Sequence, residues 1–331
     1  MRPWLLLPSK LAHDISPYLL NAYSRFKSLD HYTWEPFEWK GLQFSNRLGI
    51  AGGVDKNGEN VEAWWTLGAG FVEVGTVTPQ PQEPNPGKIM DRHVSAEALW
   101  NKMGFPSKGC QVARSHLKAL YQPHFSPVFV NVGKNRNTPN EEAAKDYIYL
   151  IDHLHEYADA FVINVSSPNT KGLRDLLKPA QFKAFLSPVI EANQAKSPVR
   201  PILLKISPDM EQSDLLSIID TSYELGIDGW ILTNTTSGPR NGLPFPDEGG
   251  VSGRPLSRLS KQVLKWTIEH LGDRREGKLI VSCGGAMSSE DVFFRLQLGA
   301  DLVQAYTALV YRGPFFFRQV AKAAESTRIF R

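Results

Sequence analysis

Residues 160–170 have the sequence AFVINVSSPNT, in which a mostly apolar run leads directly into a polar loop. The run lacks strict polar alternation, which is typical of a strand buried on both faces of a parallel sheet. Similar runs recur along the chain, each followed by a longer stretch with helical character. The runs are 48–51, 71–74, 128–132, 160–165, 201–206, 229–233, 278–281 and 301–305.

Eight strand–helix repeats over roughly 280 residues predict a closed (β/α)₈ barrel, the TIM-barrel architecture. An open, doubly wound sheet is the alternative, but no G-x-G-x-x-G pattern follows the first run. The spacers 76–127 and 234–277 are long enough for functional loops or extra hairpins. We assign residues 41–331 to the barrel and residues 1–40 to a short helical extension.

The extension carries apolar residues at three- and four-residue spacing, which predicts one apolar helical face. The face comprises Leu11, Ile15, Tyr18, Leu19, Ala22 and Phe26. Pro17 is expected to break it, with Ser16 as the N-cap and Pro17 as the first residue of a second helix. From the residues alone, packing of this face on the barrel is one open possibility.

Composition excludes several classes of function. The 331-residue chain has a formal net charge of +3 and no run of Lys or Arg, so nucleic acid is not an expected partner. No stretch approaches the ~20 apolar residues of a spanning helix, and the start does not resemble a signal peptide. Cys110 and Cys283 could form one bridge, but a chain of this size needs none, which favours a reduced cytoplasm, and Cys283 is expected in the core. The start is also too short and too poor in Arg and Ser for a mitochondrial transit peptide, which favours a bacterial origin. No metal-ligand spacing is present, so no metal is expected.

Polar or glycine-rich residues follow every predicted strand, where the catalytic groups of barrel enzymes lie. Lys56 and Lys205 supply positive charge for a carboxylate or a reduced flavin. Residues 284–285 and 306–307 follow the last two strands, where barrels commonly bind a cofactor phosphate. Four amides suit a flat heterocycle such as a pyrimidine or a flavin: Asn131, Asn164, Asn169 and Asn234.

Several of these segments resemble the dihydroorotate dehydrogenase family. Residues 164–170 (NVSSPNT) and 172–174 (GLR) resemble its catalytic loop, and residues 51–59 (AGGVDKNGE) resemble its first FMN loop. Ser167, where the soluble class has cysteine, and the N-terminal extension indicate the quinone-dependent class 2 enzymes. The resemblance covers nearly all of 41–315, and the further matching segments are 75–79 (GTVTP), 101–105 (NKMGF), 131–135 (NVGKN), 233–236 (TNTT), 249–255 (GGVSGRP) and 302–307 (LVQAYT).

The resemblance implies a role for each matching residue. Ser167 would take a proton from C5 of dihydroorotate while C6 passes hydride to FMN, with Thr170 and Phe105 in the proton relay and its shielding. Arg92 and Tyr306 would lie where quinone approaches. The implied FMN-binding residues are Gly52, Gly53, Val54, Asp55, Lys56, Thr76, Asn131, Asn164, Lys205, Thr233, Gly253, Gly285, Tyr306 and Thr307. The implied substrate-binding residues are Lys56, Asn101, Lys102, Met103, Gly104, Phe105, Asn164, Asn169, Asn234 and Thr235.

The resemblance also implies a cellular setting. The enzyme would make orotate for pyrimidine (UMP) biosynthesis and reduce ubiquinone or menaquinone. It would contact the cytoplasmic face of a bacterial inner membrane peripherally and need no partner protein. Residues 7–13 resemble the family's helix-linking turn, but little chain precedes them, so the first membrane-facing helix is expected to be shortened.

Two other classes of protein remain open at this point. One is another FMN barrel oxidoreductase, such as a dihydropyrimidine dehydrogenase-like domain or a soluble dihydroorotate enzyme that uses fumarate or NAD. The other is a non-catalytic barrel that binds a ligand or partner through its apolar N-terminal face.

Overall fold

Eight parallel strands form a closed barrel in a computed structural model, which describes residues 3–26, 32–120 and 122–327. The strands are β3 (Leu48–Asp55), β4 (Val72–Val77), β7 (Val128–Val132), β8 (Ala160–Asn164), β9 (Ile202–Ile206), β10 (Gly229–Leu232), β12 (Leu279–Cys283) and β13 (Leu302–Ala305). They neighbour one another in the order β10-β12-β13-β3-β4-β7-β8-β9. Each predicted run corresponds to one of them, so the (β/α)₈ prediction is confirmed and the open sheet is excluded.

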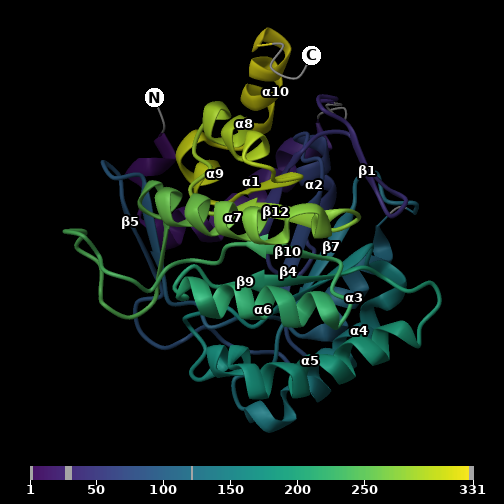
Figure 1. The fold of residues 1–331 in the computed structure, drawn as a ribbon. Coiled ribbons are helices and arrows are strands. Elements are labelled where there is room, and N and C mark those ends of the chain that lie inside the picture. Colours follow the sequence, from purple (N-terminus) through teal and green to yellow (C-terminus); the bar gives the residue numbers. More distant parts are fainter. Residues whose placement is uncertain (1–2, 27–31, 121, 328–331) are drawn as a thin grey trace.

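Helices surround the barrel, as Figure 1 shows. They are α2 (Val61–Thr66), α3 (Cys110–Ala119), α4 (Ala143–Leu154), α5 (Pro179–Gln194), α6 (Gln212–Glu224), α7 (Ser257–Leu271), α8 (Ser289–Gln297), α9 (Thr307–Arg312) and α10 (Phe316–Thr327). Short 3-10 turns lie at η1 (Pro3–Leu6), η2 (Asn140–Glu142), η3 (His155–Tyr157), η4 (Leu173–Leu177), η5 (Arg254–Leu256) and η6 (Gly272–Arg275). Helices α6 and α7 end at the predicted glycines Gly226 (φ +89°) and Gly272 (φ +49°), because glycine adopts positive φ readily.

A hairpin of β1 (Phe37–Trp39) and β2 (Leu42–Phe44) packs aromatic side chains against the barrel interior. The ring of Phe44 lies edge-on to Phe71 and Phe129, with centroids 6.0 and 6.2 Å apart. Phe71 and Phe129 lie near the amino ends of β4 and β7. The hairpin therefore fills the amino-terminal end of the barrel and leaves the opposite end for chemistry.

The two long spacers build one antiparallel sheet. The first spacer contributes β5 (Met90–His93) and β6 (Ala98–Asn101), and the second contributes β11 (Gly250–Gly253). The strands lie in the order β11-β6-β5. Strand β6 ends at Asn101, so this outer sheet positions one of the amides that are predicted to bind substrate.

The N-terminal extension contains one continuous helix, α1 (Ser9–Arg25), with Pro17 inside it. The prediction of a break and a second helix at Pro17 is therefore wrong. Proline lacks the N–H that would bond the carbonyl of His13 four residues earlier. The Ser16 hydroxyl donates to that carbonyl at 3.0 Å and so satisfies it. The predicted turn at 7–13 is also largely helical, because only Leu7 and Pro8 precede α1.

The apolar face of α1 points away from the barrel. Leu11, Leu19 and Phe26 are 47, 64 and 92% exposed, and no residue of α1 is fully buried. The opposite face, with Leu20 and Tyr23, packs against the core. The alternative that the predicted face packs on the barrel is therefore wrong for most of its residues.

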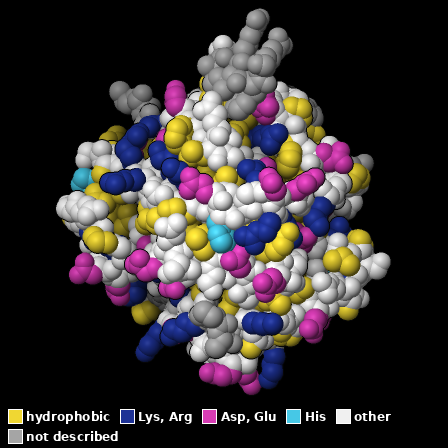
Figure 2. Space-filling view, viewed as in Figure 1, with side chains coloured by type: hydrophobic (Ala, Val, Ile, Leu, Met, Phe, Trp, Pro, Cys, Tyr) yellow, Lys and Arg dark blue, Asp and Glu magenta, His cyan; other side chains and the backbone are white. Residues whose placement is uncertain are grey.

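Charge on the outer surface is mixed. Lys and Arg side chains alternate with Asp and Glu over the face drawn in Figure 2, without a large area of one sign. Within the described ranges, no helix combines the length and the apolar character needed to cross a membrane.

Candidate active site

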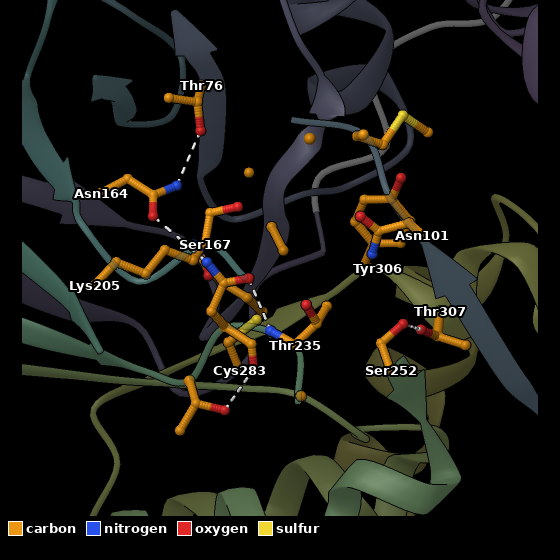
Figure 3. Close-up of a pocket in the computed structure, with 18 of the residues that line it drawn as sticks. Thr76, Asn101, Asn164, Ser167, Lys205, Thr235, Ser252, Cys283, Tyr306 and Thr307 are labelled. Carbon is orange, nitrogen blue, oxygen red and sulfur yellow. Dashed lines mark hydrogen bonds between the residues drawn. The ribbon is translucent and has the colours of Figure 1, made fainter. Parts of the chain in front are cut away.

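A cavity of about 990 Å³, including its open mouth, lies at the carboxyl ends of the barrel strands. Residues from β3, β4, β8, β9, β12 and β13 line it, and so do residues of the loop that follows β10, together with β6 and β11 of the outer sheet. In Figure 3, Ser167 and Lys205 lie on one side of this cavity and Ser252 and Thr307 on the other, with Thr235 between them.

The structure brings most of the predicted site residues to this cavity. The cofactor candidates that line it are Gly52, Gly53, Lys56, Thr76, Asn164, Lys205, Thr233, Gly285, Tyr306 and Thr307. The substrate candidates that line it are Lys56, Asn101, Met103, Gly104, Phe105, Asn164, Asn169, Asn234 and Thr235, and Ser167 lies among them. The candidates that do not line it are Val54, Asp55, Asn131, Gly253, Lys102, Thr170 and Arg92.

Several of the outlying candidates have clear structural contacts. Asp55 accepts the backbone N–H groups of Glu59 and Asn60 at 3.0 and 2.8 Å, and so shapes the turn after β3. Lys102 pairs with Glu248 at 2.7 Å. These contacts support the loops around the cavity rather than its lining.

Arg92 ties the outer sheet to the start of the chain. Its Nη2 atom donates to the carbonyls of Leu5, at 2.8 Å, and Leu7. The indole of Trp4 donates to the Val310 carbonyl at 2.7 Å. The turn η1 is thereby held against β5 and α9.

A buried carboxylate, Glu73, organises the floor of the cavity. Glu73 lies on β4 and is 0% exposed. It accepts from Lys205 Nζ at 2.8 Å, from Gln304 Nε2 at 2.5 Å and from the amide of Asn131. A buried charge is tolerable when it is paired and hydrogen-bonded in this way. The network fixes Lys205 and Gln304 where they line the cavity.

The predicted amides orient one another. Asn164 donates to Thr76 Oγ1 at 2.9 Å and to Asn131 Oδ1 at 3.2 Å. Asn169 donates to Asn101 Oδ1 at 2.8 Å, which joins the loop after β8 to the outer sheet. Hydrogen-bonded networks of this kind hold polar groups in one orientation.

Ser167 lies in the loop after β8, buried but lining the cavity. Its Oγ accepts the backbone N–H of Asn169 at 3.2 Å. The nearby Thr170 hydroxyl is buried and has no hydrogen-bond partner among the described residues. Phe105, also buried, lines the same cavity. The hydroxyl of Ser167 is therefore presented in a largely enclosed space.

The two lysines that line the cavity have different electrostatic surroundings. Burial lowers the pKa of Lys205, but the adjacent Glu73 carboxylate more than offsets it, so the net pKa is raised. Burial also lowers the pKa of Lys56, and nearby acids, Asp55 first, offset this only in part. Lys56 Nζ lies 3.0 Å from His13 Nε2 of α1, and no described carboxylate pairs with it. Lys56 is thus the lysine free to meet an added carboxylate.

The opposite end of the cavity combines hydroxyls with close backbone. The Ser252 and Thr307 hydroxyls are hydrogen-bonded at 2.9 Å. Gly284 and Gly285 have φ of +103° and +75°, and a Cβ on Gly285 would lie 2.5 Å from Ser257 Cα. Burial raises the pKa of Tyr306 to about 12, so its phenol stays protonated at neutral pH.

Sequence reasoning missed several residues of the site. Glu73 and Gln304 had a detectable signal, since each is a polar residue inside an otherwise apolar strand run. Cys283 is buried as predicted but also lines the cavity, because it is the last residue of β12. Ser252, Leu256 and Met287 had no such signal.

Among the described residues, no group of three or more His, Cys, Asp or Glu side chains could hold a metal ion.

Comparison with known proteins gives a consistent result. A model of the dihydroorotate dehydrogenase family matches residues 37–327. A quinone-dependent dihydroorotate dehydrogenase of Thermus thermophilus is 43% identical over 85% of this chain and 79% of its own length. One from Psychrobacter is 38% identical over 99% of this chain and 97% of its own.

A solved structure agrees with these sequence matches. The Eimeria tenella enzyme, crystallised in complex with ferulenol, superposes with a TM-score of 0.85 at 30% identity. The match covers 95% of this chain and 89% of the other. The chain therefore belongs to the dihydroorotate dehydrogenase family.

Proposed function

We propose that this protein oxidises dihydroorotate to orotate in pyrimidine (UMP) biosynthesis, using FMN as its cofactor and a membrane quinone as the final electron acceptor. The observation that carries the proposal is the cavity at the strand ends. There, a buried serine, a set of oriented amides and a lysine with no described carboxylate partner line one cavity. These are the groups needed to bind a flat carboxylated pyrimidine and remove a proton from it.

The chemistry of the lining fits FMN. Gln304 Oε1 is buried without a hydrogen-bond partner among the described residues, although Gln304 lines the cavity. The glycines after β12 let backbone N–H groups approach a phosphate closely. FMN bound here would supply the acceptor for the hydride and transmit two electrons to the quinone. Lys205, Thr76, Asn164 and Thr233 would hold its ring system, and Gly285, Tyr306 and Thr307 its phosphate.

The chain's own residues bind and deprotonate the substrate. Lys56 provides the positive charge for the carboxylate of dihydroorotate. Asn101, Asn164, Asn169 and Asn234 hydrogen-bond the N–H and C=O edges of the ring. Asn169 Oδ1 is buried without a partner among the described residues, so it is available for such a bond.

Ser167 acts as the base that removes the proton from C5. A free serine is a weak base, so the hydroxyl depends on its position and on a path that carries the proton away. The unpartnered Thr170 hydroxyl is suited to that relay. Phe105, which is buried and lines the same cavity, would limit the access of bulk water to this hydroxyl.

The N-terminal extension serves the acceptor side. The outward apolar face of α1 is suited to the interface of a membrane, where amphipathic helices bury one face. Arg92 and Tyr306 would lie on the path of the quinone toward the flavin. The protein would thus contact the cytoplasmic face of a bacterial inner membrane peripherally, without a partner protein.

The decisive experiment is an acceptor panel on the purified full-length protein. Yellow protein that releases FMN on denaturation, and that is bleached by dihydroorotate without oxygen, is the expected result. Reoxidation should be efficient with ubiquinone or menaquinone analogues and inefficient with fumarate or NAD. A protein that binds no FMN, or that prefers fumarate or NAD, would contradict the proposal.

A further inference from the structure

Arg295, on α8, is a charged residue that the proposed chemistry does not use. It is 0% exposed and ranks among the largest fully buried side chains of the described residues. Arginine is almost never fully buried without a partner of opposite charge. A buried guanidinium therefore needs an explanation in terms of the groups around it.

Neutral groups hold the guanidinium. It donates to Ser282 Oγ at 2.8 Å on β12, to Ser260 Oγ at 3.1 Å on α7, and to the Gly284 carbonyl at 2.6 Å. Its Nε has no partner among the described residues. Figure 1 shows the helices concerned, α7 and α8, on the same side of the barrel. The contacts position Arg295 without neutralising it.

No described carboxylate lies within ion-pair distance of Arg295. Asp291, one turn earlier on α8, attracts it at longer range, but this carboxylate accepts the Met287 N–H at 3.0 Å. Burial lowers the pKa of Arg295 to about 10, so the side chain remains protonated at neutral pH. The net result is a fixed positive charge with no ion-pair partner in the part of the chain that the structure describes.

This charge lies directly behind one end of the cavity. Gly284, whose carbonyl Arg295 binds, lines the cavity together with Gly285, Ser252 and Thr307. Among the described residues, Lys56 and Lys205 are the only cationic ones that line the cavity. Lys205 pairs with Glu73, and Lys56 contacts α1. At the end of the cavity that these hydroxyls and glycines line, no described cationic side chain belongs to the lining. Arg295 lies behind this end.

We propose that Arg295 is the positive charge that complements the FMN phosphate, acting as a positioning residue from behind the Gly284–Gly285 turn. The inference rests on the proposed binding of FMN. The guanidinium holds the Gly284 carbonyl, which orients the turn whose N–H groups meet the phosphate. Its charge attracts the phosphate through a region of low dielectric, where the attraction is stronger than in water.

The test compares FMN with riboflavin, which has the same ring system but no phosphate. Dissociation constants for both are measured by flavin fluorescence quenching on the full-length protein after removal of bound flavin. Arg295→Gln should raise the dissociation constant for FMN by roughly tenfold to a hundredfold and that for riboflavin by less than about threefold. Arg295→Lys, which keeps the charge, should restore most of the preference for FMN.

Ser260→Ala serves as the matched control, because it removes two hydrogen bonds of the same cluster, one to Arg295 and one to the Gly284 carbonyl, without changing the charge of the cluster. It should leave the ratio of the two dissociation constants near that of the wild-type protein. If Arg295→Gln weakens FMN and riboflavin equally, Arg295 only supports the fold, and the proposal is wrong. If Arg295→Gln does not fold, Arg295→Lys decides: a folded variant that binds riboflavin but has lost the FMN preference overturns the proposal.

The wild-type protein separates this inference from the proposed function. If it binds neither flavin, the FMN proposal itself fails. If it binds FMN and riboflavin with equal affinity, a flavin site exists, but the proposed positive charge does not act on the phosphate. Only the inference on Arg295 then fails.

Discussion

The barrel lines the cavity, whereas the N-terminal helix α1 contacts one lining residue, Lys56, through His13, and the two regions are built in opposite ways. The barrel side consists of buried polar groups that bond one another, with Glu73, Lys205 and Gln304 at its centre. Helix α1 has no fully buried residue and exposes Leu11 and Leu19. A rigid, satisfied network holds groups in place for chemistry. A helix with an exposed apolar face is suited to contact with another surface. We therefore expect damage to the barrel side to affect every acceptor, and damage to α1 to affect the quinone alone.

Replacement of the base should have the largest effect. Ser167→Ala should slow reduction of the flavin by dihydroorotate by roughly 10²–10⁴-fold, the usual contribution of a positioned base. Stopped-flow bleaching of the flavin measures this step directly. Turnover with a quinone and with a water-soluble dye should fall by the same factor. Orotate binding, set by the amides and Lys56, should change much less. Bleaching at nearly the wild-type rate would assign the base to another residue.

Removal of the central carboxylate should have the next largest effect. Glu73→Gln leaves the buried Lys205 charge without its partner, and breaking a buried ion pair in this way costs about 3–5 kcal/mol. Urea unfolding of the flavin-free protein measures the free energy of unfolding. Lys56→Met is the matched control, because Lys56 has no described carboxylate partner. It should cost no more than about 1 kcal/mol, the value of an ordinary hydrogen bond. Equal losses for both variants would contradict the contrast between Lys205, which is paired with a buried carboxylate, and Lys56, which is not.

Changes to the outer face of α1 should have a smaller and acceptor-specific effect. The double variant Leu11→Ser, Leu19→Ser should lower binding to lipid vesicles by about tenfold or more, because two exposed apolar side chains are lost. Turnover with a long-chain quinone should fall with it, whereas turnover with a water-soluble dye should not. Val199→Ser, at an exposed apolar residue before β9, is the control and should change neither. Parallel loss with both acceptors would mean that α1 supports the barrel structurally.

The contact between α1 and the barrel should have a weak pH dependence. Burial, and then the neighbouring Lys56 ammonium, lower the pKa of His13 from its ordinary value of 6.5. The folded state therefore favours neutral His13. The stability from this group is present above pH 6.5 and is lost as the pH falls through the lowered pKa. Thermal unfolding between pH 7.5 and 5 should show a steeper loss for the wild-type protein than for His13→Gln. Identical profiles would show that His13 does not couple the contact to pH.

Much of the barrel could be predicted because its signals are local. An apolar run, a helical spacer and a polar strand end each occupy a few neighbouring residues, and parallel barrel strands bring their carboxyl ends together. Ser167, Lys205 and the amides could be proposed as one site for that reason. Asp55 and Lys102 share the motifs but support loops, and motif position alone does not distinguish these roles.

The sequence by itself determined the eight strands, the family and most of the cavity lining, because these depend on short segments whose order along the chain sets their place in a barrel. The tertiary structure alone decided which groups pair across it. Glu73 meets Lys205 132 residues away and Gln304 231 residues away, and both contacts exist only when the barrel closes. Helix α1 continues through Pro17 with the Ser16 hydroxyl bonded to the free carbonyl of His13. Which face of α1 is exposed was decided by the way the helix packs against the barrel. Arg295 lies behind the glycine turn after β12 because α7, α8 and β12 pack together, an arrangement that no local pattern encodes.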